Sequence, residues 1–197
     1  MTKNIFIGLA ILAILSETAF AGPFGLSMGM KKSDFKGELE KLGGLNEYRY
    51  KTGTVPKEHS AFDYYIVKIT PQTGLCHITA VGKNISVNAY GDEAQRAFDS
   101  MELKLKKSYG SNTRFDYLRD GSLWDGPRYW MRVLKEEERT LMVLWNKKAG
   151  STLKDNLGAV ALSVKGIGLT TGYLRLEYAF TNKYTCDAEV AAEDSAL

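Results

Sequence analysis

The sequence predicts one α+β domain with antiparallel sheet arranged in two meanders, two main helices and one short helix. Two observations predict this class: strand-like segments follow one another across short turns, and one long segment has the apolar spacing of a helix. After removal of an N-terminal leader, 176 of the 197 residues remain, which suits a single domain with an ample core.

The first half predicts a helix followed by a meander. Phe35, Leu39 and Leu42 recur at helical spacing over residues 31–42, and Gly43-Gly44 favours a stop there. Apolar and tyrosine-rich strands are then expected at 45–51, 62–70, 75–81 and 85–90. Their short links indicate antiparallel pairing.

The second half predicts the longest helix, at 92–109. Its lysines lie late, where they suit the helix dipole, and its apolar face carries Ala94, Ala97, Phe98, Met101, Leu105 and Tyr109. Residues 111–126 are expected to be irregular, and Pro127 favours a short helix up to about residue 135. Strands are expected at 139–145, 160–167 and 173–181.

Residues 1–21 have the layout of a secretory signal peptide. Lys3 precedes an apolar run from Ile5 to Leu15, and Ala19-Phe20-Ala21 is a small-x-small cleavage signal. The run is shorter than the roughly 20 residues that a bilayer span needs. We therefore expect cleavage between Ala21 and Gly22, a periplasmic or secreted protein, and no transmembrane anchor after cleavage.

The expected mature chain has a basic body and an acidic C-terminal end. Net charge is +3, and four acids follow Cys186, so residues 22–186 carry +7. We expect a single domain at 22–186 and a mobile acidic tail at 187–197. The basic body could favour an anionic cell-wall or lipid surface. Nucleic acid is excluded as a partner by the export signal.

The chain has two cysteines, Cys76 and Cys186. In an oxidising compartment they predict one disulfide, although two free buried thiols are the alternative. The bridge would close 109 intervening residues and contribute roughly 4 to 5 kcal/mol in the chain-entropy model. Neither histidine has zinc-motif spacing to the cysteines, so no metal site is expected.

No catalytic signature or nucleotide motif is present, and no cofactor is expected. His59 lies beside Ser60 in an expected loop and His77 lies beside Cys76 in an expected strand, so either could serve as a base in a small hydrolase. Glu136, Glu137 and Glu138 are interpreted as solvated helix-end charge.

One segment suggests a binding patch. It contains Trp124, Asp125, Arg128, Tyr129 and Trp130 in a loop that leads into the short helix. Exposed, these residue types suit a sugar face or a protein hot spot. Buried, the aromatic rings would instead pack the short helix onto the sheet.

The start of the mature chain resembles small bacterial outer-membrane assembly proteins of the SmpA/OmlA type. The resemblance covers Phe24-Gly25-Leu26-Ser27-Met28-Gly29-Met30 and the expected helix that stops at Leu42-Gly43. It implies a bacterial envelope protein. The chain departs from that family at Lys31, where Thr or Ser is usual, and in lacking the lipid-bearing cysteine, so no functional residues are carried over.

These observations predict an exported, non-enzymatic protein that binds another macromolecule, either an envelope or an extracellular protein. The alternatives are a cell-wall-directed hydrolase and a binder of a small sugar or lipophilic ligand. The last alternative predicts a closed apolar cavity between sheet and helices.

Overall fold

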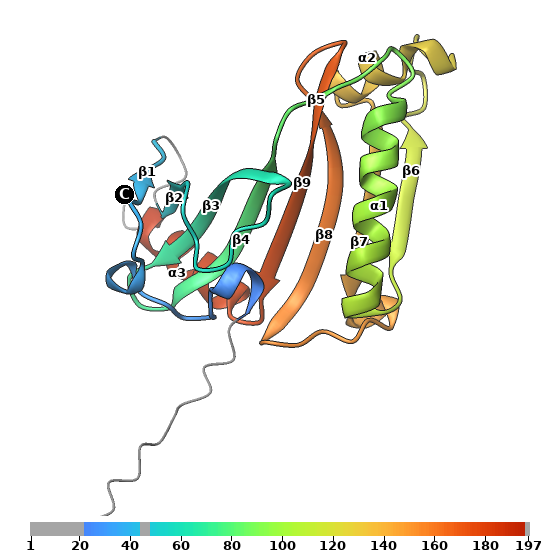
Figure 1. Ribbon diagram of the computed structural model, residues 1–197. Coiled ribbons are helices and arrows are strands. Elements are labelled where there is room, and N and C mark those ends of the chain that lie inside the picture. Colours follow the sequence, from blue (N-terminus) through green and yellow to red (C-terminus); the bar gives the residue numbers. More distant parts are fainter. Residues whose placement is uncertain (1–21, 44–47, 196–197) are drawn as a thin grey trace, which may run out of the picture.

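The computed structural model describes residues 22–43 and 48–195, and the expected signal peptide lies outside them. One nine-stranded antiparallel sheet dominates the α+β fold (Figure 1). Its strands are β1 (Glu40–Lys41), β2 (Arg49–Thr52), β3 (Phe62–Thr70), β4 (Gly74–Gly82), β5 (Ile85–Ser86), β6 (Thr113–Leu118), β7 (Arg139–Asn146), β8 (Leu157–Gly166) and β9 (Thr171–Phe180). The helices are α1 (Asp92–Tyr109), α2 (Trp130–Lys135) and α3 (Lys183–Asp194).

The expected meanders form and join into one sheet. The strand order is β1-β2-β3-β4-β9-β8-β7-β6, and β5 pairs with β9 outside this path. The two longest hairpins are β3–β4 and β8–β9. They join where β4 pairs with β9, and there Ile78 of β4 lies directly opposite Tyr178 of β9. This junction brings together segments about a hundred residues apart in the chain.

The core lies on the side of the sheet that α1 covers. Along β4, β8 and β9, alternate side chains point toward it, as the period of two in a strand requires. Buried residues of these strands and α1 include Ile78, Ala80, Val160, Leu162, Leu176, Tyr178, Ala94, Phe98, Met101 and Leu105. The helix begins and ends as predicted because its apolar face has the right spacing to meet this surface.

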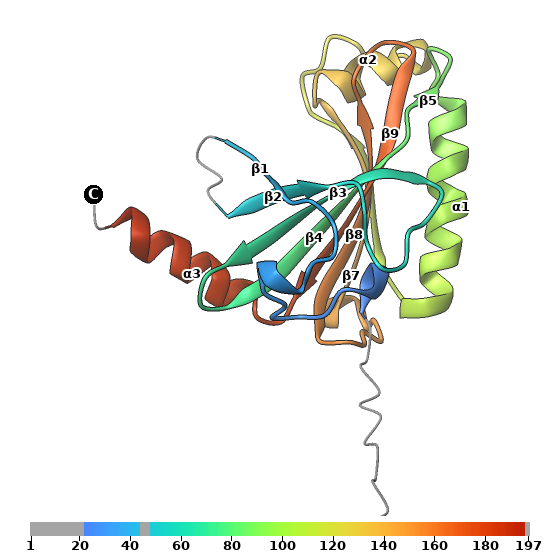
Figure 2. The same ribbon diagram turned by 60° about the vertical axis from the view of Figure 1, so that its left-hand side comes forward.

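The opposite face of the sheet carries α3 at one corner, next to β3 and β4 (Figure 2). His77, Arg175 and Glu177 occupy this face and are each partly exposed. The sheet therefore has one side with a continuous core and a second side that is covered only in part.

The expected helix at 31–42 is wrong. The structure instead has a short 3-10 turn at Lys32–Asp34 followed by β1, which pairs with β2. Phe35 and Leu39 still pack against the core, but from an extended segment. Apolar spacing over so few residues does not distinguish a helix from a strand, and Gly37 lowers helix propensity.

Two strand expectations also need correction. The segment expected as a strand at 85–90 forms only the two-residue β5, which pairs with β9 rather than with β4. The region expected to be irregular at 111–126 contains β6, which pairs with β7 over six residues. β6 is an edge strand with mostly exposed side chains, and its signal in the sequence is the short alternation of charged and aromatic residues in Arg114-Phe115-Asp116-Tyr117.

The expected acidic tail requires a correction for residues 187–194. They continue α3, which starts before Cys186 and packs on β3 and β4. Acidic side chains of this helix bond to the sheet, so the charge pattern that suggested a free tail instead provides anchoring contacts.

Candidate partner-binding site

The predicted aromatic segment lies at the end of the sheet where α2 stands, the upper end in Figure 1. Pro127 opens a 3-10 turn, Pro127–Tyr129, that runs directly into α2. Proline suits this position because its fixed φ favours the first turn and its missing N–H would have had no partner there. The backbone thus holds the segment against the end of the sheet.

Trp130 belongs to the core and not to an exposed patch. Its side chain is buried with only 7% of the residue exposed. Gly91, at the start of α1, approaches it so closely that a Cβ there would stand 2.0 Å from Cε3 of the indole. Trp130 therefore packs in the core against the start of α1. The alternative interpretation of the segment predicted this burial, but with the aromatic rings packed onto the sheet.

Trp124 and Tyr129 are half-buried and form an edge-to-face pair, with ring centroids 4.8 Å apart. The Arg132 guanidinium lies 4.4 Å from the Trp124 ring, and that of Arg128 lies 4.7 Å from the Tyr129 ring. Arg128 also donates a hydrogen bond to the Tyr129 hydroxyl at 2.6 Å. We call Trp124, Arg128, Tyr129 and Arg132 the aromatic-arginine cluster.

A pocket of about 180 Å³ adjoins this cluster. Its lining includes Leu118, Trp124, Trp130 and Arg139. A drug-sized ligand needs roughly 300 Å³ or more, so the pocket suits one side chain of a partner better than a free small molecule.

Arg139 gives the pocket a polar side. Its guanidinium pairs with Asp116 at 2.5 Å, yet its buried Nε has no hydrogen-bond partner among the described residues. An unpartnered buried donor is uncommon, because leaving it unsatisfied costs free energy.

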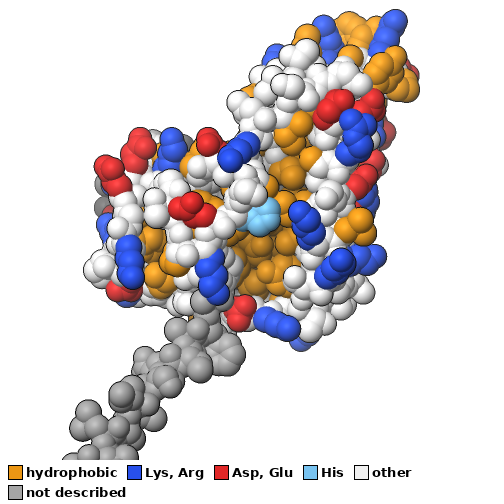
Figure 3. Space-filling model, in the orientation of Figure 1, with side chains coloured by type: hydrophobic (Ala, Val, Ile, Leu, Met, Phe, Trp, Pro, Cys, Tyr) orange, Lys and Arg blue, Asp and Glu red, His pale blue; other side chains and the backbone are white. Residues whose placement is uncertain are grey.

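Exposed large apolar side chains gather around the same end. Of the seven in the described part of the chain, five lie in β6 or in loops at this end: Tyr90, Tyr117, Leu123, Ile167 and Leu169. Leu123 is 88% exposed and directly precedes Trp124. Figure 3 shows hydrophobic side chains exposed here beside Lys and Arg side chains. Such a concentration on one region is typical of an interaction surface.

Glu138 secures the loop that carries Leu123. It accepts hydrogen bonds from the Ser122 hydroxyl at 2.6 Å and from Arg119 at 3.0 Å. The hydrogen bond from Ser122, with support from Arg119, lowers the pKa of the Glu138 carboxyl. The interpretation of Glu138 as simple solvated charge was therefore incomplete.

The two histidines occupy different settings. His59 is exposed on the β2–β3 loop, and its Nδ1 accepts a hydrogen bond from the Ala61 N–H at 3.1 Å. His77 lies on the sheet with Nε2 3.7 Å from Glu177, and burial lowers its pKa to about 4 despite this carboxylate. His77 is therefore neutral at pH 7, and its contacts are those of a residue within the sheet.

Two further pockets bear on the alternative functions. One, of about 300 Å³, is lined by Glu58, His59, Ser60 and Asp63 among others. The other, of about 360 Å³, is mainly apolar and lies against the N-terminal segment, with Leu26 and Phe35 in its lining, rather than between sheet and helices. Among the residues that the structure describes, no group of three or more His, Cys, Asp or Glu could hold a metal ion.

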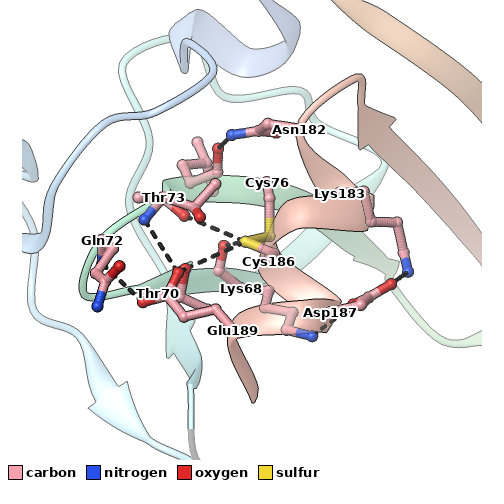
Figure 4. The surroundings of a disulfide bond; sticks show 12 residues. Lys68, Thr70, Gln72, Thr73, Cys76, Asn182, Lys183, Cys186, Asp187 and Glu189 are labelled. Atoms are coloured by element: carbon pink, nitrogen blue, oxygen red, sulfur yellow. Dashed lines mark hydrogen bonds and ion pairs between the residues drawn. A yellow bond between two sulfur atoms is a disulfide. The ribbon is translucent and has the colours of Figure 1, made fainter. Parts of the chain in front are cut away.

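The predicted disulfide is present. Cys76 on β4 is bonded to Cys186 on α3, and both residues are fully buried (Figure 4). Around it, Glu189 accepts hydrogen bonds from Thr70 Oγ1 at 2.6 Å and from the Gln72 N–H at 2.7 Å. The disulfide and these contacts attach α3 to the β3–β4 hairpin.

Sequence reasoning missed part of the site. Leu118, Arg132 and Arg139 join the predicted aromatic residues only through the fold, since they come from β6, α2 and β7. The run of Trp, Tyr and Arg was the one available signal, and it located the cluster but included the buried Trp130.

Comparisons with protein families, with curated proteins and with solved structures found no match for this chain. Within residues 22–43 and 48–195, no helix is long and apolar enough to cross a membrane.

Proposed function

We propose that this protein is exported and binds a protein partner through the aromatic-arginine cluster, without catalysing a reaction. One observation carries the proposal: Trp124 and Tyr129, each with an arginine on its ring, border a pocket the size of one side chain. Most of the exposed large apolar residues in the described part of the chain lie around it. Trp, Tyr and Arg are the residues enriched at the energetic centres of protein interfaces.

Charge at this end favours a protein over an anionic polymer or lipid surface. Acidic side chains lie among the arginines, with Asp125 beside the cluster and Glu136 and Glu137 at the end of α2. A surface that recognises polyanions needs an excess of positive charge. Here the two signs are mixed, so apolar and aromatic contacts would provide most of the affinity.

The proposed location is the bacterial periplasm or the extracellular medium, with cleavage between Ala21 and Gly22. Support comes from the signal-peptide pattern, from the N-terminal resemblance to envelope assembly proteins, and from the disulfide, which fits an oxidising compartment.

The test is capture of the partner from native cell envelope by the tagged mature chain, residues 22–197, with mild cross-linking. Trp124→Ala should abolish capture of the protein that the unmodified chain enriches, because it removes one wall of the pocket. Tyr184→Ala is the matched control: this aromatic residue is 85% exposed on α3, far from the cluster. Thermal unfolding of both variants checks that they are folded.

Equal capture by Trp124→Ala and by the control would contradict the proposal. Retention on cell-wall sacculi or lipid vesicles, with no enriched protein, would instead assign the chain to a glycan or lipid surface.

A hydrolase is the second candidate, carried by the pocket that contains His59. It brings together an imidazole, the Ser60 hydroxyl and the carboxylates of Glu58 and Asp63. Release of soluble fragments from purified cell-wall sacculi, lost in His59→Ala and kept in His77→Ala, would support it. Failure of the unmodified chain to release fragments removes this candidate.

A further inference from the structure

The sheet ends in a regular edge strand, β6. β6 is the last strand in the sheet order, whereas the strand at the other end, β1, has only two residues. β6 pairs with β7 over six consecutive residues without a bulge and contains no proline. Bulges, proline, short length and charged side chains are the usual means of preventing a further strand from pairing with an edge, and of these β6 has only the charges of Arg114 and Asp116.

The ladder with β7 determines which backbone groups point outward. The Arg119 N–H donates to the Glu138 carbonyl at 2.7 Å, so these two directly opposed residues form a hydrogen-bonded pair. Such pairs alternate along an antiparallel ladder. Thr113, Phe115 and Tyr117 therefore bond to β7, whereas Arg114, Asp116 and Leu118 direct their N–H and C=O groups away from the sheet.

We infer that the outer edge of β6 pairs with β6 of a second copy, antiparallel, with Phe115 opposite Phe115 of the partner copy. In this register, Arg114 lies opposite Asp116 of the other copy, twice by symmetry. The outward backbone groups of these two residues then form hydrogen-bonded pairs. Opposite charges stand face to face on the α1 side, and the two Phe115 rings meet on the other side, an arrangement that stabilises strand pairs.

Neighbouring registers that also match the outward backbone groups are less favourable. These registers move each residue's partner by two positions. One direction places Arg114 opposite Arg114 of the other copy, and the other direction places Asp116 opposite Asp116. Like charges directly opposed destabilise a strand pair. The alternation of charge in Thr113-Arg114-Phe115-Asp116-Tyr117-Leu118 thus selects the self-complementary register.

Charges at the edge are already balanced within one copy. Arg114 bonds Asp99 and Glu102 of α1 at 2.9 and 2.6 Å, and Asp116 bonds Arg139 of β7. The second copy therefore extends two existing ion-pair networks and does not bury an isolated charge, which would have opposed pairing.

The two-fold arrangement leaves the aromatic-arginine cluster free. That cluster adjoins the C-terminal end of β6 at Leu118. In an antiparallel pair the C-terminal ends of the two strands lie at opposite ends of the pair. The two clusters of the dimer would lie at opposite ends of one continuous sheet and could each bind a partner.

Single cysteines test both the dimer and its register. Residues opposed in a non-hydrogen-bonded pair have Cα atoms about 4.5 Å apart, within disulfide range. The mature chain with Phe115→Cys should form a disulfide-linked dimer on mild oxidation. Thr113→Cys is the matched control, since it should lie about 13 Å from its own copy, and Phe115→Cys should give at least about tenfold more linked dimer.

A mixture of Thr113→Cys and Tyr117→Cys chains should link to each other, because these positions are opposed in the inferred register. The native cysteines are bonded and fully buried, so they stay out of the exchange. Sedimentation equilibrium of the unmodified mature chain should show a concentration-dependent dimer.

Three outcomes would overturn the inference. One is a monomer at all concentrations up to several hundred micromolar. A second is equal linkage through Phe115→Cys and Thr113→Cys, which reports random collision. The third is a dimer that Trp124→Ala dissociates, which would place the contact at the aromatic-arginine cluster instead of at β6.

Discussion

Cys186 on the last helix is disulfide-bonded to Cys76 on β4, 110 positions earlier in the chain, and neither residue is accessible to solvent. The bond attaches α3 to the first hairpin, on the side of the sheet opposite α1. Lys68 on β3 adds an ion pair to Asp187 of α3 at 2.7 Å. The C-terminal acids therefore help to hold the helix in place.

Removing the disulfide should destabilise the protein strongly. Because the bond restricts a long loop in the unfolded chain, the double change Cys76→Ala and Cys186→Ala is expected to lower the free energy of unfolding by about 4 kcal/mol. Urea denaturation at pH 7 measures the difference, and reduction of the unmodified chain should produce a similar loss. Unchanged stability in both experiments would mean that the loop is already restricted without the bond.

Glu189 should stabilise the protein as an anion. Burial opposes its charge, but hydrogen bonds from Thr70, Gln72 and Thr73 outweigh this and lower the pKa of the carboxyl to about 2. A lowered pKa gives stability that is present above the unfolded value near 4.5 and is lost as pH falls toward 2. Glu189→Gln should cost about 2 kcal/mol at pH 7.

The difference between Glu189→Gln and the unmodified chain should shrink below pH 4, because Glu189 is then protonated in the unfolded chain but still charged in the folded one. Urea denaturation at pH 7 and pH 3 measures this. Glu38→Gln, at an exposed position, is the control and should match the unmodified chain at both values. A constant difference across this range would show that the charge of Glu189 is not what stabilises α3.

His77 should make the fold sensitive to mild acid. Burial lowers its pKa to about 4, although Glu177 acts in the opposite direction. The unfolded chain, with a value near 6.5, takes up the proton first as pH falls, so stability declines between about pH 6.5 and 4. We expect a loss of about 2 kcal/mol between pH 7 and pH 5. Urea denaturation should show this loss in His59→Gln but not in His77→Gln.

Gly91 should tolerate no side chain. Gly91 and Gly150 both lie in the left-handed helical region, with a φ of 72° at each, so alanine costs about 1–2 kcal/mol at either position. At Gly91 the added Cβ would also collide with the Trp130 ring, and overpacking should raise the loss to about 4 kcal/mol. Thermal unfolding compares the two variants, and equal losses would show that α2 shifts freely away from α1.

The spacing of apolar residues predicted those helices and strands in which the spacing repeats over many residues. The helix at 92–109 and the hairpin strands of β3–β4 and β8–β9 were confirmed, because their apolar residues recur often enough to indicate one buried face. The segment at 31–42 had too few repeats. Its apolar residues pack on the core from an extended backbone, since pairing with β2 satisfies the backbone of β1.

The candidate site was predictable only in part. Trp124 and Tyr129 were found because aromatic residues and arginines cluster in the sequence. Burial of Trp130 depends on Gly91, almost forty positions away, and Arg139 reaches the pocket from another strand. Local composition carries no information about such distant neighbours.

By itself, the sequence determined the α+β class, the long helix, the central hairpins and the single possible disulfide pairing, because each depends on local periodicity or on a count of two cysteines. Only the tertiary structure decided that β4 meets β9, that the acidic C-terminal residues form an anchored helix, and that β6 ends the sheet. These features depend on which surfaces pack together, and packing between distant segments is set by the shape and burial of the whole chain.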